Sequence, residues 1–299
     1  MRPASNSRRR ARPLLGTFVE IAVAGAPHAA MDRAIDAAFA AIAEVHRLMS
    51  FQSPDSDVTR INRVAGMRPV AVHPWTFQVL ETALDLHRRS AGAFDITAFP
   101  RAQGVDGRDE AVHDGKGNGS DALELLEGNR VIAHRPGIAV DLGGIAKGFA
   151  VDRARDVLLA HEMPRGLVNA GGDLAALGAA LAPISIRDPR DPRRILCEVE
   201  VQDAALASSA PLFDPTTGTG ATSAAIIDPG SGDAATAACG ATIGAPSCMI
   251  ADALTKIVMI AGEKAEVLLR EEAASALMVT RDGEIRVTRD WQHAVRRAA

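Results

Sequence analysis

Four segments of the chain carry apolar residues at every third or fourth position, the spacing of helices that bury one face. They cover residues 29–48, 75–90, 145–161 and 249–261. Pro74 stands just before the second segment and Gly262 just after the fourth, positions where proline and glycine commonly start and end helices. The pattern therefore predicts four helices.

Shorter apolar runs, several of them alternating with polar residues, predict strands. They cover residues 17–23, 137–140, 166–172 and 195–201, with hairpins at 123–134 and 276–288. The stretch between residues 204 and 246 is rich in small residues and is interpreted as mostly turns. Because strands and helices do not alternate regularly, we expect an α+β fold with mainly antiparallel sheets and packed helices.

The predicted elements form one domain that follows a short N-terminal tail. Residues 1–13 are rich in arginine and are expected to be a flexible basic tail, and residues 14–299 to be a single domain. The basic run and the apolar residues after it imitate a secretion signal, but Glu20 interrupts the apolar stretch. Residues 234–251 are too weakly apolar for a membrane span. We therefore expect a cytoplasmic protein without membrane insertion, with a surface loop at 103–120.

Composition excludes several classes of function. The net charge of -4 gives no basic field for nucleic acid, and an aromatic fraction of 3% without tyrosine gives no platform for stacking bases. The three cysteines form no CxxC pair, and the histidines show no paired metal spacing. No motif of a serine or cysteine nucleophile is present, so no catalytic residue is assigned.

The most informative local pattern is AVDLGGIAKGFAVD, residues 139–152. A predicted strand ends at Asp141, the pair Gly143-Gly144 makes a tight turn, and a helix begins. The N–H groups at a helix start favour a phosphate, and Lys147 adds a positive charge. Asp141 can accept a hydrogen bond from a ring N–H or a ribose hydroxyl. A helix-entry turn with a capping aspartate and a solvated lysine explains the pattern equally well.

Two further segments contain polar side chains that could bind a metal ion or a ligand. Asp252, Thr255 and Lys256 fall within about one helical turn, and carboxylate and hydroxyl oxygens suit Mg²⁺. An acidic first turn of a helix is the alternative. Asn169 and Asp173 flank a second pair of glycines and could face a ligand, although a tight turn between strands is the favoured interpretation.

Seven segments in this order resemble the ApbE family of FAD:protein FMN transferases. They are LLGTFVEI, MSFQSPDSDVTRIN, GAFDITAFP, VDLGGIAKGFAVD, LVNAGGDL, IIDPGSG and ADALTK, and they run from Leu14 to Lys256. The resemblance implies a two-lobed fold with a flavin cleft between the lobes. It also implies Mg²⁺-dependent transfer of FMN from FAD to a Thr or Ser hydroxyl of an acceptor flavoprotein, with release of AMP.

Carried over by motif, the resemblance implies two sets of site residues. The residues in contact with FAD would be Leu15, Ala93, Phe94, Asp95, Asp141, Lys147 and Ile227, or Ile226 in place of Ile227. The Mg²⁺ ligands would be Gly144 through its carbonyl and Asp252 through its carboxylate, and Thr255, the residue before the family's threonine position, is taken as the third ligand.

Three positions differ from the family pattern. Ala225 stands where the family has a histidine before IIDP, Gln52 where it has an aromatic residue, and Lys256 where it has a metal-binding threonine. These differences keep two alternatives open, a non-catalytic FAD-binding protein and an FAD pyrophosphatase that releases FMN and AMP.

Overall fold

The computed structural model describes residues 6–98, 119–179, 182–210, 226–292 and 295–297. Apart from its last two residues, the predicted loop at 103–120 lies outside the described residues, and so does Ala225. None of the helices in the described part of the chain combines the length and the apolar character needed to cross a membrane.

All four predicted helices are confirmed, with boundaries within about two residues. The α-helices are α1 (His28–Met49), α2 (Asp57–Arg63), α3 (Pro74–Arg89), α4 (Ala146–Ala160), α5 (Cys248–Ala261) and α6 (Glu266–Glu271), and the 3₁₀ helices are η1 (Ser120–Ala122), η3 (Gly262–Ala265) and η4 (Arg289–Trp291). Pro74 occupies the first turn of α3, where a missing N–H costs little. Gly262 ends α5 with a φ of 59°, a backbone angle that glycine adopts without strain.

The strands of the described chain form three antiparallel sheets, as expected for an α+β fold. They are β1 (Ser7–Leu14), β2 (Thr17–Ala24), β3 (Val70–Ala71), β4 (Leu123–Leu126), β5 (Arg130–Ala133), β6 (Arg165–Ala170), β7 (Asp173–Leu177), β8 (Ala182–Asp188), β9 (Asp191–Val201), β10 (Ala205–Ser209), β11 (Gly240–Ala245), β12 (Ser275–Val279), β13 (Ile285–Val287) and β14 (Val295–Arg297). The large sheet has the order β1-β2-β6-β7-β10-β11-β12-β13, and the small sheets have the orders β14-β9-β8 and β3-β5-β4.

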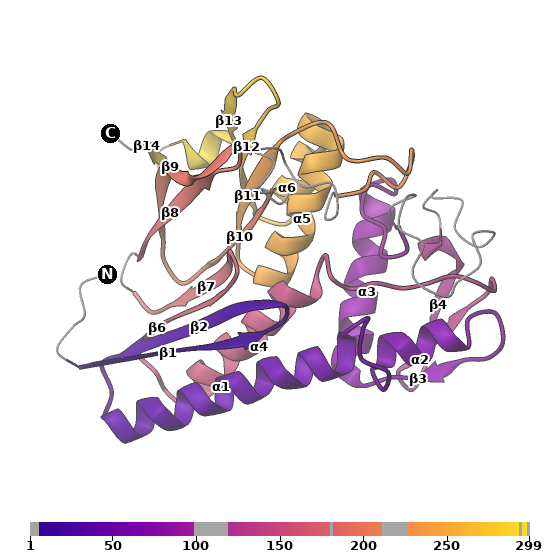
Figure 1. Ribbon diagram of the computed structural model, residues 1–299, viewed down its shortest axis with the longest axis horizontal. Helices are drawn as coiled ribbons and strands as arrows, with labels where there is room; N and C mark the ends of the chain where they lie inside the picture. Colours follow the sequence, from indigo (N-terminus) through magenta and orange to yellow (C-terminus); the bar gives the residue numbers. More distant parts are fainter. Residues whose placement is uncertain (1–5, 99–118, 180–181, 211–225, 293–294, 298–299) are drawn as a thin grey trace.

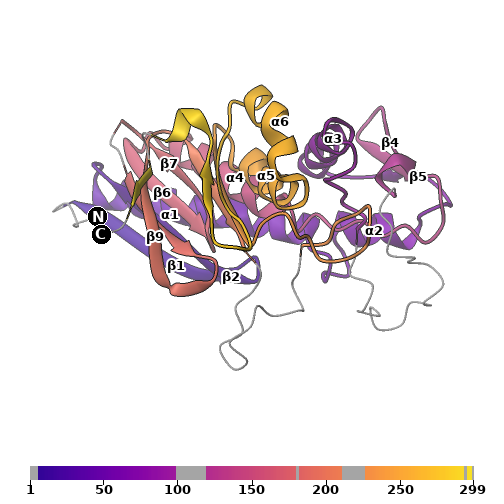
Figure 2. The same cartoon turned by 90° about the horizontal axis from the view of Figure 1, so that it is seen from above.

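The large sheet is covered on both faces. Successive side chains of a strand point to opposite faces, and along β7 Ala175 belongs to the core under the helices, whereas Leu174 and Ala176 belong to a second core. Helices α1, α4 and α5 cover the first face, and the sheet β14-β9-β8 lies over the second (Figures 1 and 2). Strong burial of both faces fixes the strand register.

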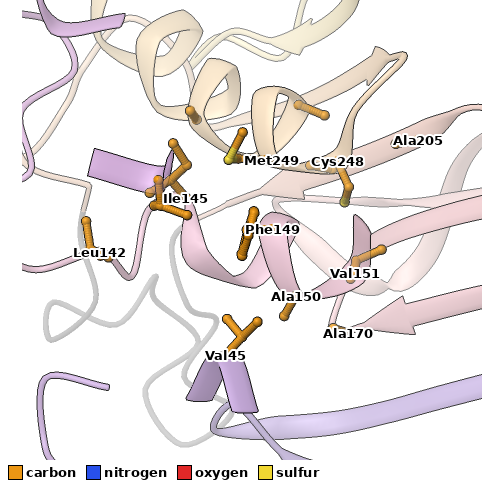
Figure 3. Packing of buried hydrophobic residues seen from close by; sticks show 14 of the residues in the cluster. Val45, Leu142, Ile145, Phe149, Ala150, Val151, Ala170, Ala205, Cys248 and Met249 are labelled. Carbon is orange, nitrogen blue, oxygen red and sulfur yellow. The ribbon is translucent and has the colours of Figure 1, made fainter. Parts of the chain in front are cut away.

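Helix α4 lies at the centre of the larger core. Phe149 is 1% exposed, and Figure 3 shows it between Met249 of α5 and Val45 of α1. Trp75 of α3 packs edge-on against the same ring, with the centroids 6.1 Å apart. This contact joins the part of the chain that contains α2, α3 and the sheet β3-β5-β4, at the far end of α1 in Figure 1, to the main core.

The expectation of a flexible tail is wrong for residues 7–13, because they belong to β1, which pairs with β2 along its whole length. Alternate arginines of β1 meet carboxylates of α1: Arg10 lies 2.8 Å from Asp32 and 3.0 Å from Asp36. Arg12 also bonds Asp36, and its guanidinium stacks over Phe39. Arg10 and Arg12 are therefore paired with carboxylates of α1, and Arg9 with Glu20 of β2, so these basic residues serve the fold.

Two other expectations about strands are wrong. Residues 137–140 form no strand, although Val140 is fully buried. The small-residue stretch between 204 and 246, taken as turns, contains β10 and β11 in the middle of the large sheet. The strands predicted at 17–23, 166–172 and 195–201, and both hairpins, are confirmed.

Candidate functional site

The turn that leads into α4 is held by a side chain from a distant helix. Asn62 of α2 donates to the carbonyl of Val140 at 3.0 Å and accepts from its N–H at 2.7 Å, which replaces the strand partner that Val140 lacks. The next residue, Asp141, donates its N–H to the carbonyl of Ile96 at 2.7 Å. Both backbone groups of Val140 are satisfied although it is buried, so the position of Asp141 is well fixed.

The carboxylate of Asp141 organises the glycine turn. Its Oδ1 accepts from the N–H of Gly143 at 2.8 Å. Burial raises the pKa of this carboxyl above its ordinary value, and the N–H of Gly143 offsets part of that shift. One carboxylate oxygen is therefore used for the turn, and the other remains able to accept a hydrogen bond from a ligand.

The loop at residues 93–97 reaches the same turn. Phe94 is 4% exposed, and a Cβ built on Gly144 would lie 3.5 Å from its ring. The carboxylate of Asp95 accepts from the N–H of Thr97 at 2.7 Å and from its hydroxyl at 2.6 Å, so this residue shapes its own loop. Ala93 packs partly buried against the core. Phe94, one of these three predicted FAD contacts, is therefore placed beside the glycine turn.

Helices α4 and α5 are joined by two reciprocal hydrogen-bond sets. Asp152 of α4 accepts from the N–H of Cys248 at 2.8 Å and of Met249 at 2.9 Å, and so caps the start of α5. Asp252 of α5 accepts from the N–H of Gly148 at 3.1 Å. A Cβ on Gly148 would lie only 2.2 Å from the carbonyl oxygen of Cys248, so the close approach of the helices depends on glycine at this position.

Two lysines and two buried carboxylates meet where these helices approach the sheet. Lys147 bonds Asp173 of β7, and its Nζ lies 3.6 Å from Oδ2 of Asp252. Lys256 bonds Oδ1 of Asp252 and, at 3.0 Å, the backbone carbonyl of the same residue. Asp173 and Asp252 are 1% and 0% exposed, so the lysines are essential for keeping both carboxylates charged. We call these four residues the charge cluster.

The charged groups of the charge cluster shift one another's pKa values. Burial alone would lower the pKa of Lys147, but the carboxylates of Asp252 and Asp173 raise it above its ordinary value, so this lysine stays protonated. Burial, together with the charge of Asp252, raises the pKa of Asp173 to about 6 even though Lys147 opposes the shift. Asp173 therefore changes its charge closer to neutral pH than an ordinary aspartate does.

The raised pKa of Asp173 makes stability depend on pH. The folded state holds this proton more tightly than the unfolded chain, whose pKa is near 3.8, so the stabilisation is complete below pH 3.8 and is lost as pH rises through about 6. Relative to Asp173→Asn, we expect the parent to lose unfolding free energy between these values, by up to about 3 kcal/mol. Urea unfolding of both proteins at pH 4, 5, 6 and 7 measures this, and a difference that stays constant with pH contradicts it.

Two of the predicted Mg²⁺ ligands, Asp252 and Thr255, already use their oxygens in hydrogen bonds within the protein. Both oxygens of Asp252 already have partners, Lys256 on one and the N–H of Gly148 on the other. The hydroxyl of Thr255 donates to the carbonyl of Asp252 at 2.7 Å and meets the hydroxyl of Ser209 at 2.7 Å. Among the described residues, no three His, Cys, Asp or Glu side chains are grouped to hold a metal ion. The residues as arranged do not fit a bound magnesium ion.

The other two predicted FAD contacts lie in separate turns. Leu15 sits between β1 and β2 with a φ of 55°, and a Cβ on Gly171 would lie 2.6 Å from the hydroxyl of the nearby Thr17, so this turn adjoins the one before Asp173. Ile227 is partly buried and forms a β-bridge with Ala234. The structure thus joins Lys147 and Asp252 in the charge cluster, places Gly144 beside the side chain of Lys256, and leaves Ile227 in a turn of its own.

A pocket lies between the large sheet and the sheet β14-β9-β8. Its lining includes Asn169, Gly172, Ser208, Ser209 and Thr242 but none of the charge cluster. Ser209 connects the pocket to Thr255. Asn169 uses its side-chain oxygen to accept from the N–H of Gly172, which supports the turn interpretation of this segment.

Sequence reasoning missed several residues that build the site. Asn62 and Asp152 lie inside the recognised motifs, but the pattern alone gives no partner for either. Gly148 lies inside the predicted helix 145–161, where a glycine costs about 1 kcal/mol relative to alanine, and that cost is a sequence signal for a packing role.

Fold and site together define an α+β protein in which a glycine turn, a helix start and two lysines converge on buried carboxylates. The sequence profile described as the ApbE family matches residues 15–280. The chain belongs to the ApbE family.

Relatives with assigned names agree with this membership. The FAD:protein FMN transferase of Vibrio cholerae is 29% identical over 250 residues, which cover 74% of this chain and 71% of the relative. The FAD:protein FMN transferase of Treponema pallidum is 28% identical over 329 aligned residues, which cover 93% and 86%.

Solved structures share the fold over nearly the whole chain. The flavin transferase ApbE of Vibrio cholerae superposes with a TM-score of 0.83 at 26% identity, covering 98% of this chain and 100% of that one. The ApbE protein of Thermotoga maritima superposes with a TM-score of 0.83 at 25% identity, covering 96% and 99%.

Proposed function

We propose that this protein transfers the FMN part of FAD to a Thr or Ser hydroxyl of an acceptor flavoprotein and releases AMP. The observation that carries the proposal is that Lys147, in the first turn of α4, and Lys256, whose Cε lies 3.7 Å from a Cβ built on Gly144, meet at the carboxylate of Asp252. Two ammonium groups beside a helix start form a site for a doubly charged pyrophosphate, the group that joins FMN to AMP in FAD. The family relatives named FAD:protein FMN transferase support the same reaction.

The reaction makes one phosphorus–oxygen bond and breaks another. The acceptor oxygen bonds to the FMN phosphorus, the bond to the bridging oxygen breaks, AMP leaves with that oxygen, and the hydroxyl proton is released. Negative charge grows on the leaving phosphate. Lys147 is partly exposed at 35% and stays protonated, so it can stabilise that charge without a change of its own state.

Asp141 has a different role in this proposal. Its carboxylate lies at the turn with one oxygen bonded to Gly143, and the second accepts an N–H of the flavin or adenine ring, or a ribose hydroxyl. Phe94, which is 4% exposed, packs against the same turn and holds it in place from the side of the core. FAD, which has a pyrophosphate, is therefore expected to bind more tightly than FMN.

The role of Asp141 predicts a loss of affinity on truncation. Because a hydrogen bond to a charged group contributes about 1.5–3 kcal/mol, Asp141→Ala should weaken FAD binding roughly 10- to 100-fold. Calorimetric titration with FAD and with FMN measures both the loss and the preference. Asp156→Ala, which removes an exposed carboxylate of α4, is the matched control and should bind as the parent does.

Turnover separates the proposed reaction from its alternatives. The protein is incubated with FAD and an acceptor flavoprotein, AMP is quantified, and the acceptor is weighed by mass spectrometry. AMP together with a covalent FMN on the acceptor supports the transferase. AMP and free FMN without an adduct indicate a pyrophosphatase, and FAD binding without AMP indicates a non-catalytic flavin protein.

A further inference from the structure

Lys256 occupies the position at which the carboxylate of Asp252 would meet a cation. Its Nζ bonds Oδ1 of Asp252 and lies 3.0 Å from the carbonyl oxygen of the same residue. The side chain is 16% exposed and Asp252 is fully buried, so this contact is enclosed by protein. The opposite oxygen of Asp252 accepts from Gly148 and faces Lys147 at 3.6 Å.

The formal charges of the cluster already balance. Above the pKa of Asp173 the two carboxylates carry two negative charges, and Lys147 and Lys256 carry two positive charges. In the ligand-free protein, a divalent ion added here would leave two uncompensated positive charges at a buried site and would repel both ammonium groups at close range. A protonated lysine offers no lone pair, so it is not a ligand for such an ion.

The position of Lys256 and the hydrogen bonds of Thr255 also argue against a bound divalent ion. A Cβ built on Gly144 would lie 3.7 Å from Cε of Lys256, so the lysine stem runs beside the turn that a phosphate would approach. The hydroxyl of Thr255 gives its proton to the carbonyl of Asp252 and contacts Ser209 of β10. Thr255 therefore faces the sheet and is already used in the packing of α5.

We propose that the ammonium of Lys256 is the cation of this site, so that the pyrophosphate of FAD is held by Lys256 and Lys147 without a divalent ion on Asp252. The inference rests on the proposed function for the identity of the ligand. It goes beyond that function because it replaces a diffusible ion by a residue of the chain, and so changes what the protein requires in order to bind its substrate.

The first test needs no substitution. FAD is titrated into the parent protein in EDTA and again in excess Mg²⁺. The affinities should agree within about threefold, because the fixed ammonium is present in both. If EDTA weakens FAD binding tenfold or more and Mg²⁺ restores it, the inference is wrong and the proposed function stands. If FAD fails to bind under both conditions, the proposed function fails, and with it the inference.

The second test uses substitutions. Lys256→Thr should bind FAD roughly 10- to 100-fold more weakly in EDTA and recover part of that loss in Mg²⁺, whereas Lys256→Met should lose affinity and recover none. Lys264→Thr, an exposed lysine of η3, is the matched control and should match the parent. Parent-like affinity of Lys256→Met in EDTA overturns the inference.

A third measurement detects the binding of a divalent ion directly. Mn²⁺ added to the ligand-free proteins is followed by its electron paramagnetic resonance signal, which decreases when the ion binds. The parent should leave the signal unchanged, and Lys256→Thr should reduce it, because the substitution frees Asp252 and supplies a hydroxyl. Binding of Mn²⁺ by the parent with the affinity of the variant contradicts the assignment of Lys256.

Discussion

Gly148→Ala is expected to destabilise the protein by about 2 kcal/mol or more and to abolish most FAD binding. The new methyl group would lie 2.2 Å from the carbonyl oxygen of Cys248 and 2.8 Å from Cβ of Asp252, so α4 and α5 must separate. Overpacking of this kind costs about 1–3 kcal/mol and more against backbone, whereas the gain in helix propensity returns only about 1 kcal/mol. Urea unfolding and FAD titration measure the two effects.

A control for this substitution lies on the same helix. Ala160→Val adds volume at an exposed position at the end of α4 and should change the unfolding free energy by less than about 1 kcal/mol. A Gly148→Ala protein as stable as the parent would mean that α4 and α5 do not approach as closely as the structure has them.

Lys147→Met should cost about 3 kcal/mol of stability and weaken FAD binding strongly. The substitution leaves Asp173 and Asp252 buried with one ammonium between them, and removing one partner of a buried ion pair typically costs 3–5 kcal/mol. The lower end applies because the ammonium of Lys147 is about one-third exposed, and solvent screens part of its interaction. Chemical denaturation at pH 7 gives the stability, and calorimetry gives the affinity.

The double variant Lys147→Met with Asp173→Asn separates electrostatics from packing. It removes one charge of each sign, so most of the lost stability should return, while FAD affinity should stay low because the proposed phosphate partner is still missing. Stability that does not recover would show that Lys147 acts through its packing, and FAD affinity that recovers would show that its charge does not contact the ligand.

The helices could be predicted from sequence because their apolar spacing is also their burial pattern. Phe149 and Leu158, for example, are both at most 1% exposed. Strands β10 and β11 were missed for the opposite reason: ALASS and GATIGA consist largely of small residues with weak strand propensity. Their conformation is imposed by neighbouring strands and by α5, which packs on both, and no short segment contains that information.

The candidate site was predictable at the level of motifs but not of contacts. Asp141, Lys147 and Asp252 stood out by residue type and by their position near glycine turns or helix starts. That Asp173 would pair with Lys147 could not be read from the sequence, because the pair is 26 residues apart and depends on how β7 meets α4.

The prediction of a flexible N-terminal tail failed because the arginine content suggested a solvated segment. Asp32 and Asp36, which are spaced to share one face of α1, offered partners for these arginines.

The reciprocal bonds between α4 and α5 also govern how the site can come apart. Asp152 holds the start of α5, and Asp252, four residues into that helix, holds the backbone of Gly148, four residues before Asp152. Moving the two helices apart breaks both sets of hydrogen bonds, so each set helps to keep the other formed. We therefore expect local opening between α4 and α5 to lower nucleotide affinity and to expose the N–H groups of Gly148, Cys248 and Met249 together.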